Sequence, residues 1–307
     1  MQRKTINNRD IDTHWLHTES DYPIAPGLQS EVTLWDGTLE QVETIRDAHR
    51  AGTLAFRHEI TRSHFVGRPF STWDDVTKAV GEPWEAGLKM LDKVRDQLSS
   101  VELPRPKNIR RQPCWSDEAG DELDLDRYRA REPFWRTSHR ARATAPRVVT
   151  MAVNIAASCA MSSLAIAWRG ATACMMADIL EAQGYRVEIL AACIMSGVWR
   201  NGNSNLQGTW IKKVDERCDI ADLINALSGW YFRTVLFGST GLTGKYAVSH
   251  MGMPGKVTKE MVKAIDPATS DECWLIEGAF DFRSAVSLAT RLLGTLAEAE
   301  TVKASTY

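Results

Sequence analysis

Apolar residues in the second half of the chain follow first the pattern of a buried strand and then that of a helix. Residues 148–155 are apolar on both faces except at Thr150, which is typical of a central strand in a covered parallel sheet. Gly184 stands where a helix ends in a left-handed C-cap, and residues 185–190 then alternate as a second strand. Between the strands lies a stripe with the spacing of one helix face: Leu164, Trp168, Ala171, Met175 and Ile179.

Strand, helix and strand within about 45 residues form one βαβ unit. Its crossover should be right-handed, which makes the two strands parallel. The polar turn 154–163 then lies at the carboxyl end of the first strand, where open α/β sheets place their ligand sites. The pattern predicts an α/β fold with a doubly wound, mostly parallel sheet, and Asn154 and Ser158 are the first candidate site residues.

The remaining patterns predict further elements and an order of regions. Strands are expected at residues 206–214, 231–237 and 274–280, and helices at residues 38–51, 72–80, 83–99, 219–227 and 283–299. Asp219 and Asp281 are placed to cap the last two helices. The predicted regions are an extended arm (1–30), a helical N-terminal region (31–103), a linker (104–146), the α/β domain (147–300) and a tail (301–307).

Composition narrows the class of protein without indicating a chemistry. The chain has 307 residues, of which 44% are hydrophobic, and this is enough for a proper core. Its formal net charge of −2 argues neither for nor against nucleic-acid binding. Its six cysteines form no Cys-x-x-Cys pair, which favours reduced, buried thiols over a zinc site. The longest apolar stretch, 156–167, is too short to cross a bilayer, and the first residues have no apolar signal core. We expect a soluble cytoplasmic protein without a cofactor.

The predicted linker contains two oppositely charged segments. Residues 117–126 hold six carboxylates, which favours a solvated acidic turn, with a divalent cation site as the alternative. Within this turn, residues 122–125 alternate like a short surface strand. The arginine-rich segment that follows also holds Phe134 and Trp135, and arginines among aromatics can bind a phosphate backbone and stack on bases. These arginines could instead pair with the acidic turn or line a protein interface: Arg127, Arg129, Arg131, Arg136, Arg140, Arg142 and Arg147.

No enzyme motif is complete in this chain. The glycine-rich segment 238–245 follows a predicted strand and ends in Gly-Lys. A phosphate loop, however, has four residues between its glycines rather than five, and Tyr246 stands where a Ser or Thr must bind magnesium. Since no acid–base pair, nucleophile elbow or metal triad is visible, we expect a protein that is not an enzyme. An active site assembled from distant residues is the remaining enzymatic alternative.

The order of elements from residue 117 to about 300 resembles the von Willebrand factor A-type (vWA-like) domain, in the form carried by the cobalt-chelatase large subunit. The matching stretches are Ala177-Asp-Ile-Leu-Glu181 and Gly184-Tyr-Arg-Val-Glu-Ile-Leu190. The chain also resembles uncharacterised bacterial and phage proteins, a likeness that implies no mechanism. The vWA-like resemblance implies contacts with other proteins at the top of the sheet.

That family holds magnesium through an Asp-x-Ser-x-Ser motif, the metal-ion-dependent adhesion site. The matching positions here are Asn154, Ala156 and Ser158, so one carboxylate and one hydroxyl are missing; Thr209 could match the family's distant threonine. A hard cation needs oxygen ligands, preferably anionic ones, and we therefore expect little or no magnesium binding. The leading hypothesis is a non-catalytic binding or assembly protein that contacts a protein partner or a second copy of itself, and the alternative is RNA or DNA binding by the arginine-rich segment.

Overall fold

The structure is a computed structural model that describes most of the chain. The described residues are 1–7, 14–15, 29–54, 66–68, 70–98, 114–118, 120, 122–137, 147–157, 161–196, 204–217, 219–240, 242, 253–270 and 272–305. They form two compact units, the first made of Met1–Pro104 and Val148–Tyr307 and the second of Arg105–Arg147. None of the helices in this part of the chain is both long and apolar enough to cross a membrane.

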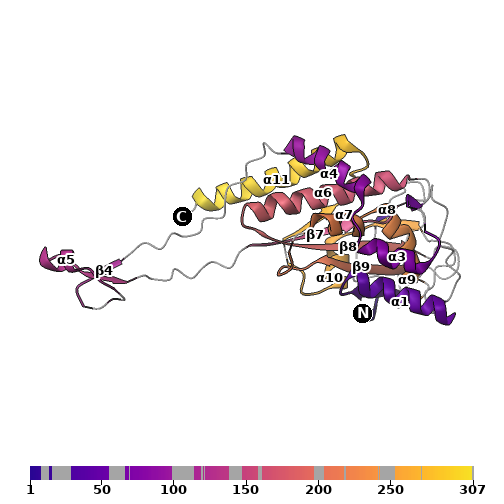
Figure 1. The fold of residues 1–307 in the computed structure, drawn as a ribbon, viewed down its shortest axis with the longest axis horizontal. Coiled ribbons are helices and arrows are strands. Elements are labelled where there is room, and N and C mark those ends of the chain that lie inside the picture. Colours follow the sequence, from indigo (N-terminus) through magenta and orange to yellow (C-terminus); the bar gives the residue numbers. More distant parts are fainter. Residues whose placement is uncertain are drawn as a thin grey trace. The chain divides into compact units, whose positions relative to one another are not determined.

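The first unit is built on an eight-stranded mixed sheet (Figure 1). Its five central strands run in the order β11-β7-β8-β9-β3, with every contact parallel except that between β8 and β9. Strand β1 extends the sheet antiparallel to β3, and β10 pairs with the end of β8 and with β2. The strands are β1 (Gln2–Asn7), β2 (His14–Trp15), β3 (Gln29–Trp35), β7 (Val148–Asn154), β8 (Arg186–Ser196), β9 (Ser204–Lys212), β10 (Met253–Lys256) and β11 (Cys273–Ile276).

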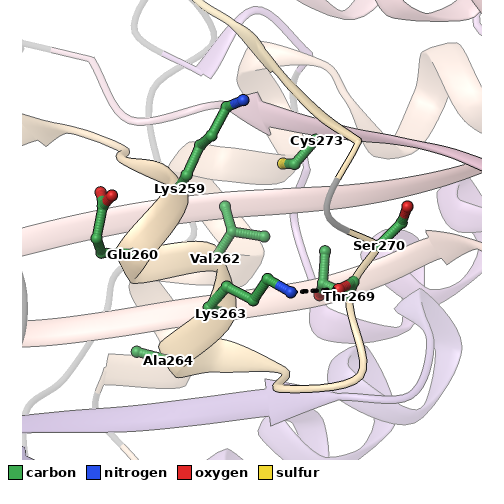
Figure 2. A pocket seen from close by; sticks show the side chains of 8 residues that line it. All are labelled: Lys259, Glu260, Val262, Lys263, Ala264, Thr269, Ser270 and Cys273. Atoms are coloured by element: carbon green, nitrogen blue, oxygen red, sulfur yellow. Dashed lines mark hydrogen bonds between the residues drawn. The ribbon is translucent and has the colours of Figure 1, made fainter.

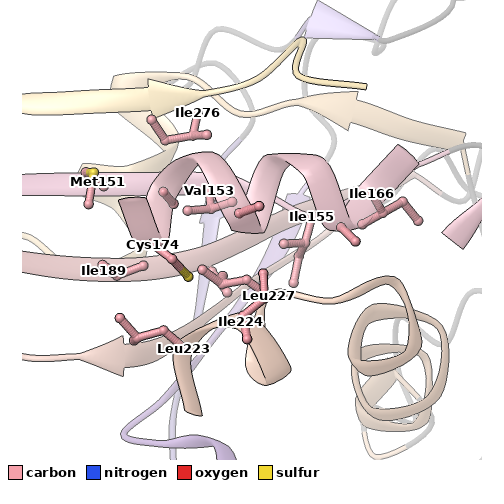
Figure 3. Packing of buried hydrophobic residues seen from close by; sticks show 14 of the residues in the cluster. Met151, Val153, Ile155, Ile166, Cys174, Ile189, Leu223, Ile224, Leu227 and Ile276 are labelled. Carbon is pink, nitrogen blue, oxygen red and sulfur yellow. The ribbon is translucent and has the colours of Figure 1, made fainter. Parts of the chain in front are cut away.

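Helices cover both faces of this sheet, which confirms the predicted α/β fold. Met151 and Val153 of β7 belong to one hydrophobic cluster and Ala152 to another, because successive residues of a strand point to opposite faces. Helix α6 (Ser163–Ala182) lies over the first face, and α4 (Glu85–Leu98) and α11 (Phe282–Ser305) pack on α6. On the second face α10 (Lys259–Ile265) contacts β9 and β3. Figure 3 shows the first cluster, between α6, α7 (Ile220–Ala226) and the sheet.

Helix α6 is buried on nearly all sides rather than along one stripe. Every residue from Ile166 to Ala177 is buried, whereas Leu164, a member of the predicted stripe, is 53% exposed. The reason is that α4 and α11 cover the outer side of the helix, which an amphipathic pattern leaves to solvent. Gly184 has a φ of 92°, so the predicted left-handed position at the helix end is present.

The predicted strand at residues 231–237 is wrong, because this run is helical. The segment forms α8 (Gly229–Tyr231), the π-helix η2 (Phe232–Leu236) and α9 (Phe237–Thr240). The Ser228 hydroxyl caps it by accepting a hydrogen bond from the Tyr231 N–H. A short apolar run fits a buried strand and a buried helix equally well, and tertiary packing decides between them.

The N-terminal third contains strands as well as the expected helices. Helices α1 (Thr38–Ala51) and α3 (Trp73–Val80) form where the pattern predicts them. Strand β3, however, was not predicted, although Val32 and Leu34 alternate with Thr33 and Trp35 as in a strand. All four side chains are buried, because helices cover both faces of the sheet.

The second unit is a small three-stranded antiparallel sheet with one helical turn. Its strands β4 (Cys114–Ser116), β6 (Trp135–Thr137) and β5 (Glu122–Leu123) pair in that order, and α5 (Leu125–Arg129) follows β5. The short strand predicted within the acidic turn is therefore present as β5. The side chain of Asp124 caps α5 by accepting from the N–H groups of Asp126 and Arg127.

Candidate functional site

The side chain of Asn154, at the carboxyl end of β7, is fully used by hydrogen bonds within the protein. Its Nδ2 donates to the Gly255 carbonyl at 3.0 Å and to the Glu277 carboxylate at 2.9 Å. Its Oδ1 accepts from the Ala156 N–H at 3.0 Å. Asn154 is 0% exposed, so it presents no oxygen to a cation or a substrate from outside.

Arg169 of α6 binds the backbone of the same turn, residues 154–156. Its Nη1 donates to the carbonyl oxygens of Asn154 at 2.7 Å and of Ala156 at 2.8 Å. The guanidinium carbon lies 4.7 Å from the centre of the Phe280 ring, and the residue is 1% exposed. A fixed positive charge of the protein therefore lies against the carbonyls that end β7.

Glu277 supplies the negative charge that acts on Arg169. Its Oε1 accepts from Asn154 Nδ2 and, at 2.7 Å, from the Val257 N–H. Burial lowers the pKa of Arg169 to about 10 and the charge of Glu277 opposes this shift, so the guanidinium stays protonated at neutral pH. We call Asn154, Arg169 and Glu277 the turn cluster; Asn154 and Arg169 are buried, Glu277 is half-buried, and the Glu277 charge favours the protonated guanidinium.

The other residues of the predicted metal motif are not gathered around Asn154. Ala156 is buried and contributes only backbone groups, and Ser158 lies outside the described residues. Thr209 of β9 is aligned through Ala191 with Val153, so its side chain points to the face opposite that of Asn154.

Thr209 belongs instead to a buried polar cluster on the other face. Its hydroxyl and that of Tyr231 both donate to Gln41 Oε1, at 2.9 and 2.7 Å. Burial raises the pKa of the Tyr231 hydroxyl well above its usual value, so this group remains a donor. The arrangement ties α1 and the segment after Ser228 to the sheet, which is a structural role.

Three exposed apolar side chains lie on the segments that follow β7 and β11 in the chain. Leu164, Phe280 and Phe282, which we call the apolar rim, are 53%, 41% and 37% exposed. Phe280 stacks on Arg169, and the ring of Phe282 lies 6.0 Å from that of Trp168. Leu164 is four residues before Trp168 and so lies on the same side of α6. The carboxyl ends of β7 and β11 are therefore bordered by exposed apolar surface.

In the second unit, Arg127 and Arg129 lie close to acidic residues. Arg127 stacks on Trp115 at 4.2 Å and pairs with Glu132 at 2.9 Å, and Arg129 lies 3.6 Å from Asp126. Arg131 and Arg136 are exposed, Arg147 is half-buried, and Arg140 and Arg142 lie outside the described residues. Glu122 of β5 is paired in register with Arg136 of β6. The acidic turn and the arginine-rich segment thus meet within one small sheet.

Other predicted features carry no site in the described part of the chain. Gly238 belongs to helix α9 and is buried, and a Cβ atom there would lie 2.9 Å from Ile45 and Trp73, so this glycine serves helix packing. Gly241 and residues 243–245 of that segment are not described. No group of three or more His, Cys, Asp or Glu residues that could hold a metal occurs among the residues the structure describes.

Sequence reasoning missed Arg169 and Glu277, the two charged members of the turn cluster. Arg169 is the only charged residue between Ser163 and Ala177. A single charge inside an apolar helix is rarely buried without a partner, and this was the available signal. Its partner could not be identified, because Glu277 is more than one hundred residues away in sequence.

Comparison with known proteins places the chain in a single family. The model of a family described as a domain of unknown function (DUF7192) matches residues 29–283. No curated protein matches the chain. No solved structure matches it either.

Proposed function

The chain belongs to the DUF7192 family, and we propose that it is a non-catalytic binding or assembly protein. In this proposal its sheet is a vWA-like domain that has lost its metal and makes protein–protein contacts at the carboxyl ends of β7 and β11. The partner we propose is a second copy of the chain. The observation that carries the proposal is the apolar rim, of which Phe280 contacts Arg169 of the closed turn cluster.

The closed turn supports the non-catalytic part of the proposal. Both donors of Asn154 and its carbonyl oxygen are satisfied by Gly255, Glu277 and Ala156. Arg169 already places a positive charge on the carbonyls that follow β7. A cation there would meet a guanidinium instead of free carboxylate oxygens. The turn therefore retains its shape through protein groups alone.

The apolar rim supports contact with a second copy. Exposed apolar side chains that adjoin one another mark interaction surfaces more often than single exposed ones do. A two-fold interface needs only one self-complementary patch, and aromatic side chains are its usual anchors. The charges of Arg169 and Glu277 attract each other, so covering the rim would not bury an isolated charge of the turn cluster.

Light scattering on the purified chain tests this proposal. We expect an oligomer that the double substitution Leu164→Glu with Phe282→Glu converts to a monomer, while the circular dichroism spectrum stays unchanged. Leu39→Glu, at a similarly exposed leucine of α1, is the control and should remain oligomeric. A monomeric wild-type protein, or a double variant that still assembles, overturns the proposed contact.

Adding or removing divalent metal tests the part of the proposal in which the turn after β7 binds no metal ion. Assembly and melting temperature should be the same in excess magnesium and in EDTA, because a ligand stabilises only the state that binds it. A melting temperature that rises with magnesium in the wild type and not in Asn154→Ala would show that the turn still holds the ion.

Nucleic-acid binding by the second unit is the alternative proposal. Exposed Tyr128, Arg129, Arg131 and Arg136 support it, while the neighbouring carboxylates weaken the attraction for phosphates. It predicts a mobility shift of RNA or DNA that falls steeply with salt and is lost in Arg136→Glu with Arg140→Glu. A shift unaffected by these substitutions removes the alternative.

A further inference from the structure

Polar side chains lie on the first face of the sheet where β3 and β9 run side by side. Thr33 is aligned with Gln207, and Trp35 is aligned with Thr209. Leu34, between Thr33 and Trp35, belongs to the hydrophobic cluster of the second face, so its two neighbours point to the first face, which α1 covers here. We call Thr33, Trp35, Gln207 and Thr209 the polar strip, and each of them is 2% exposed or less.

Much of the polar strip is buried without hydrogen bonds. The Thr33 hydroxyl, the Trp35 indole N–H and the Gln207 amide nitrogen have no hydrogen-bond partner among the residues that the structure describes. The amide nitrogen of Gln41, which reaches the strip from α1, also has none there. A buried polar group without a partner costs free energy that it regains in contact with water. These four groups therefore oppose the packing of α1 on β3 and β9.

Charged groups on the second face are placed differently. A hollow of about 520 Å³ lies there between α10 and β11, and Figure 2 shows Lys259 and Glu260 at its border. Both residues are exposed, so water solvates their charges. The four groups under α1 are instead out of reach of water as long as the helix stays in place.

Few buried side chains attach α1 to the sheet. Of its 14 residues, three are buried: Gln41, Val42 and Ile45. In α6, by comparison, every residue from Ile166 to Ala177 is buried. The ion pair of Arg50 with Asp74 of α3 is exposed on both sides and therefore adds little. Figure 1 shows α1 lying apart from α4, α6 and α11, so its movement would not disturb that layer of helices.

We propose that α1 is a lid that lifts from β3 and β9 while α4, α6 and α11 stay in place. Opening brings water to the polar strip, and the hydrogen bonds gained there offset part of the cost of exposing Val42 and Ile45. The open state presents a hydrogen-bonding surface on β3 and β9 that the closed state hides. The proposal does not depend on self-association, because neither α1 nor the polar strip contains a residue of the apolar rim.

Native-state hydrogen exchange tests the lid. We expect backbone amides in the middle of α1 to exchange at least about a hundredfold faster than those of β7 and β8, with a smaller dependence on urea, because lid opening exposes less surface than global unfolding. Thr33→Val should slow the exchange of α1 severalfold, because valine keeps the shape of threonine and removes a hydroxyl that only the open state solvates. Amides of α1 that exchange at the rate and with the urea dependence of β7 overturn the proposal.

Thiol labelling distinguishes an opening lid from a helix that only frays at its ends. Thr33→Cys introduces a thiol on β3, and Cys193, which is aligned with Gln207 two strands away on β8, is the internal control. In the folded protein the introduced thiol should react with maleimide at least about tenfold faster than Cys193, as located by mass spectrometry. An introduced thiol that reacts no faster than Cys193 overturns the lid, even if the ends of α1 exchange quickly. Hydrogen exchange of the wild type decides the question if this variant does not fold.

Discussion

Replacing Asn154 by aspartate restores the carboxylate of the adhesion-site motif and should destabilise this protein rather than give it a metal. The change removes the two hydrogen bonds that Nδ2 donates, to Gly255 and to Glu277. It also places a second carboxylate oxygen about where Nδ2 lay, 2.9 Å from the Glu277 carboxylate. Two unit charges at that distance repel by about 6 kcal/mol at an effective dielectric constant of about 20.

Protonation limits this cost and makes it depend on pH. An aspartate with an ordinary pKa of about 3.9 takes up a proton at pH 7 for about 4 kcal/mol, which is less than the repulsion. The folded variant therefore holds the introduced carboxyl group protonated, with a pKa raised above its unfolded value. Arg169 lowers the penalty somewhat, and the lost bond to Gly255 adds about 1 kcal/mol. We expect a loss of about 3–5 kcal/mol at pH 7.

The sign of the pH dependence follows from that raised pKa. Below about pH 4 the introduced carboxyl group is protonated in both the folded and the unfolded chain, and only about 1 kcal/mol should separate the variant from the wild type. As pH rises, the unfolded chain alone loses the proton, so the penalty grows by about 1.4 kcal/mol per pH unit until the folded pKa is reached.

Urea unfolding followed by tryptophan fluorescence at pH 5 and pH 7 measures this difference. Glu277→Gln is the matched control: in its background, Asn154→Asp should lose most of the pH-dependent penalty, because no second charge remains. An Asn154→Asp protein as stable as the wild type at pH 7, or equally destabilised at both pH values, would refute the described contacts.

Three further predictions concern stability and reactivity. Arg169→Leu leaves the carbonyls of Asn154 and Ala156 without their donor and Glu277 without its counter-charge, so urea unfolding should show a loss of about 3–5 kcal/mol; full stability would contradict the network. Gly208→Ala places a Cβ 2.5 Å from Ile265 and should lower the melting temperature, at a cost of about 1–3 kcal/mol, whereas Gly294→Ala in α11 meets no atom within 4 Å and should raise it. Burial raises the pKa of Cys193 to about 12 and that of Cys273 to about 11, so both thiols should resist maleimide labelling up to about pH 9 and react only after unfolding, as read by mass spectrometry; rapid labelling of the folded protein at pH 7 would show that they are accessible.

The sequence by itself determined those helices and strands for which the hydrophobic period and the capping residues indicate the same element. The helix at Thr38–Ala51 and the helix capped by Asp219 form where the pattern predicts them. Strand β7 and the parallel strand β8 also follow from their apolar runs and the helix between them. In each case the information lies within a few turns of chain, which is the range over which hydrophobic periodicity acts.

Only the tertiary structure decided what the turn after β7 contains. The residues that close it, Arg169, Gly255 and Glu277, are separated by up to 123 positions from Asn154, and no local pattern links them. Sequence also could not decide between strand and helix for residues 231–237, because residues 231–236 are all buried and no solvent-facing side shows the period of the run. Burial and charge pairing depend on which segments meet in space, and that is settled by the packing of the whole first unit.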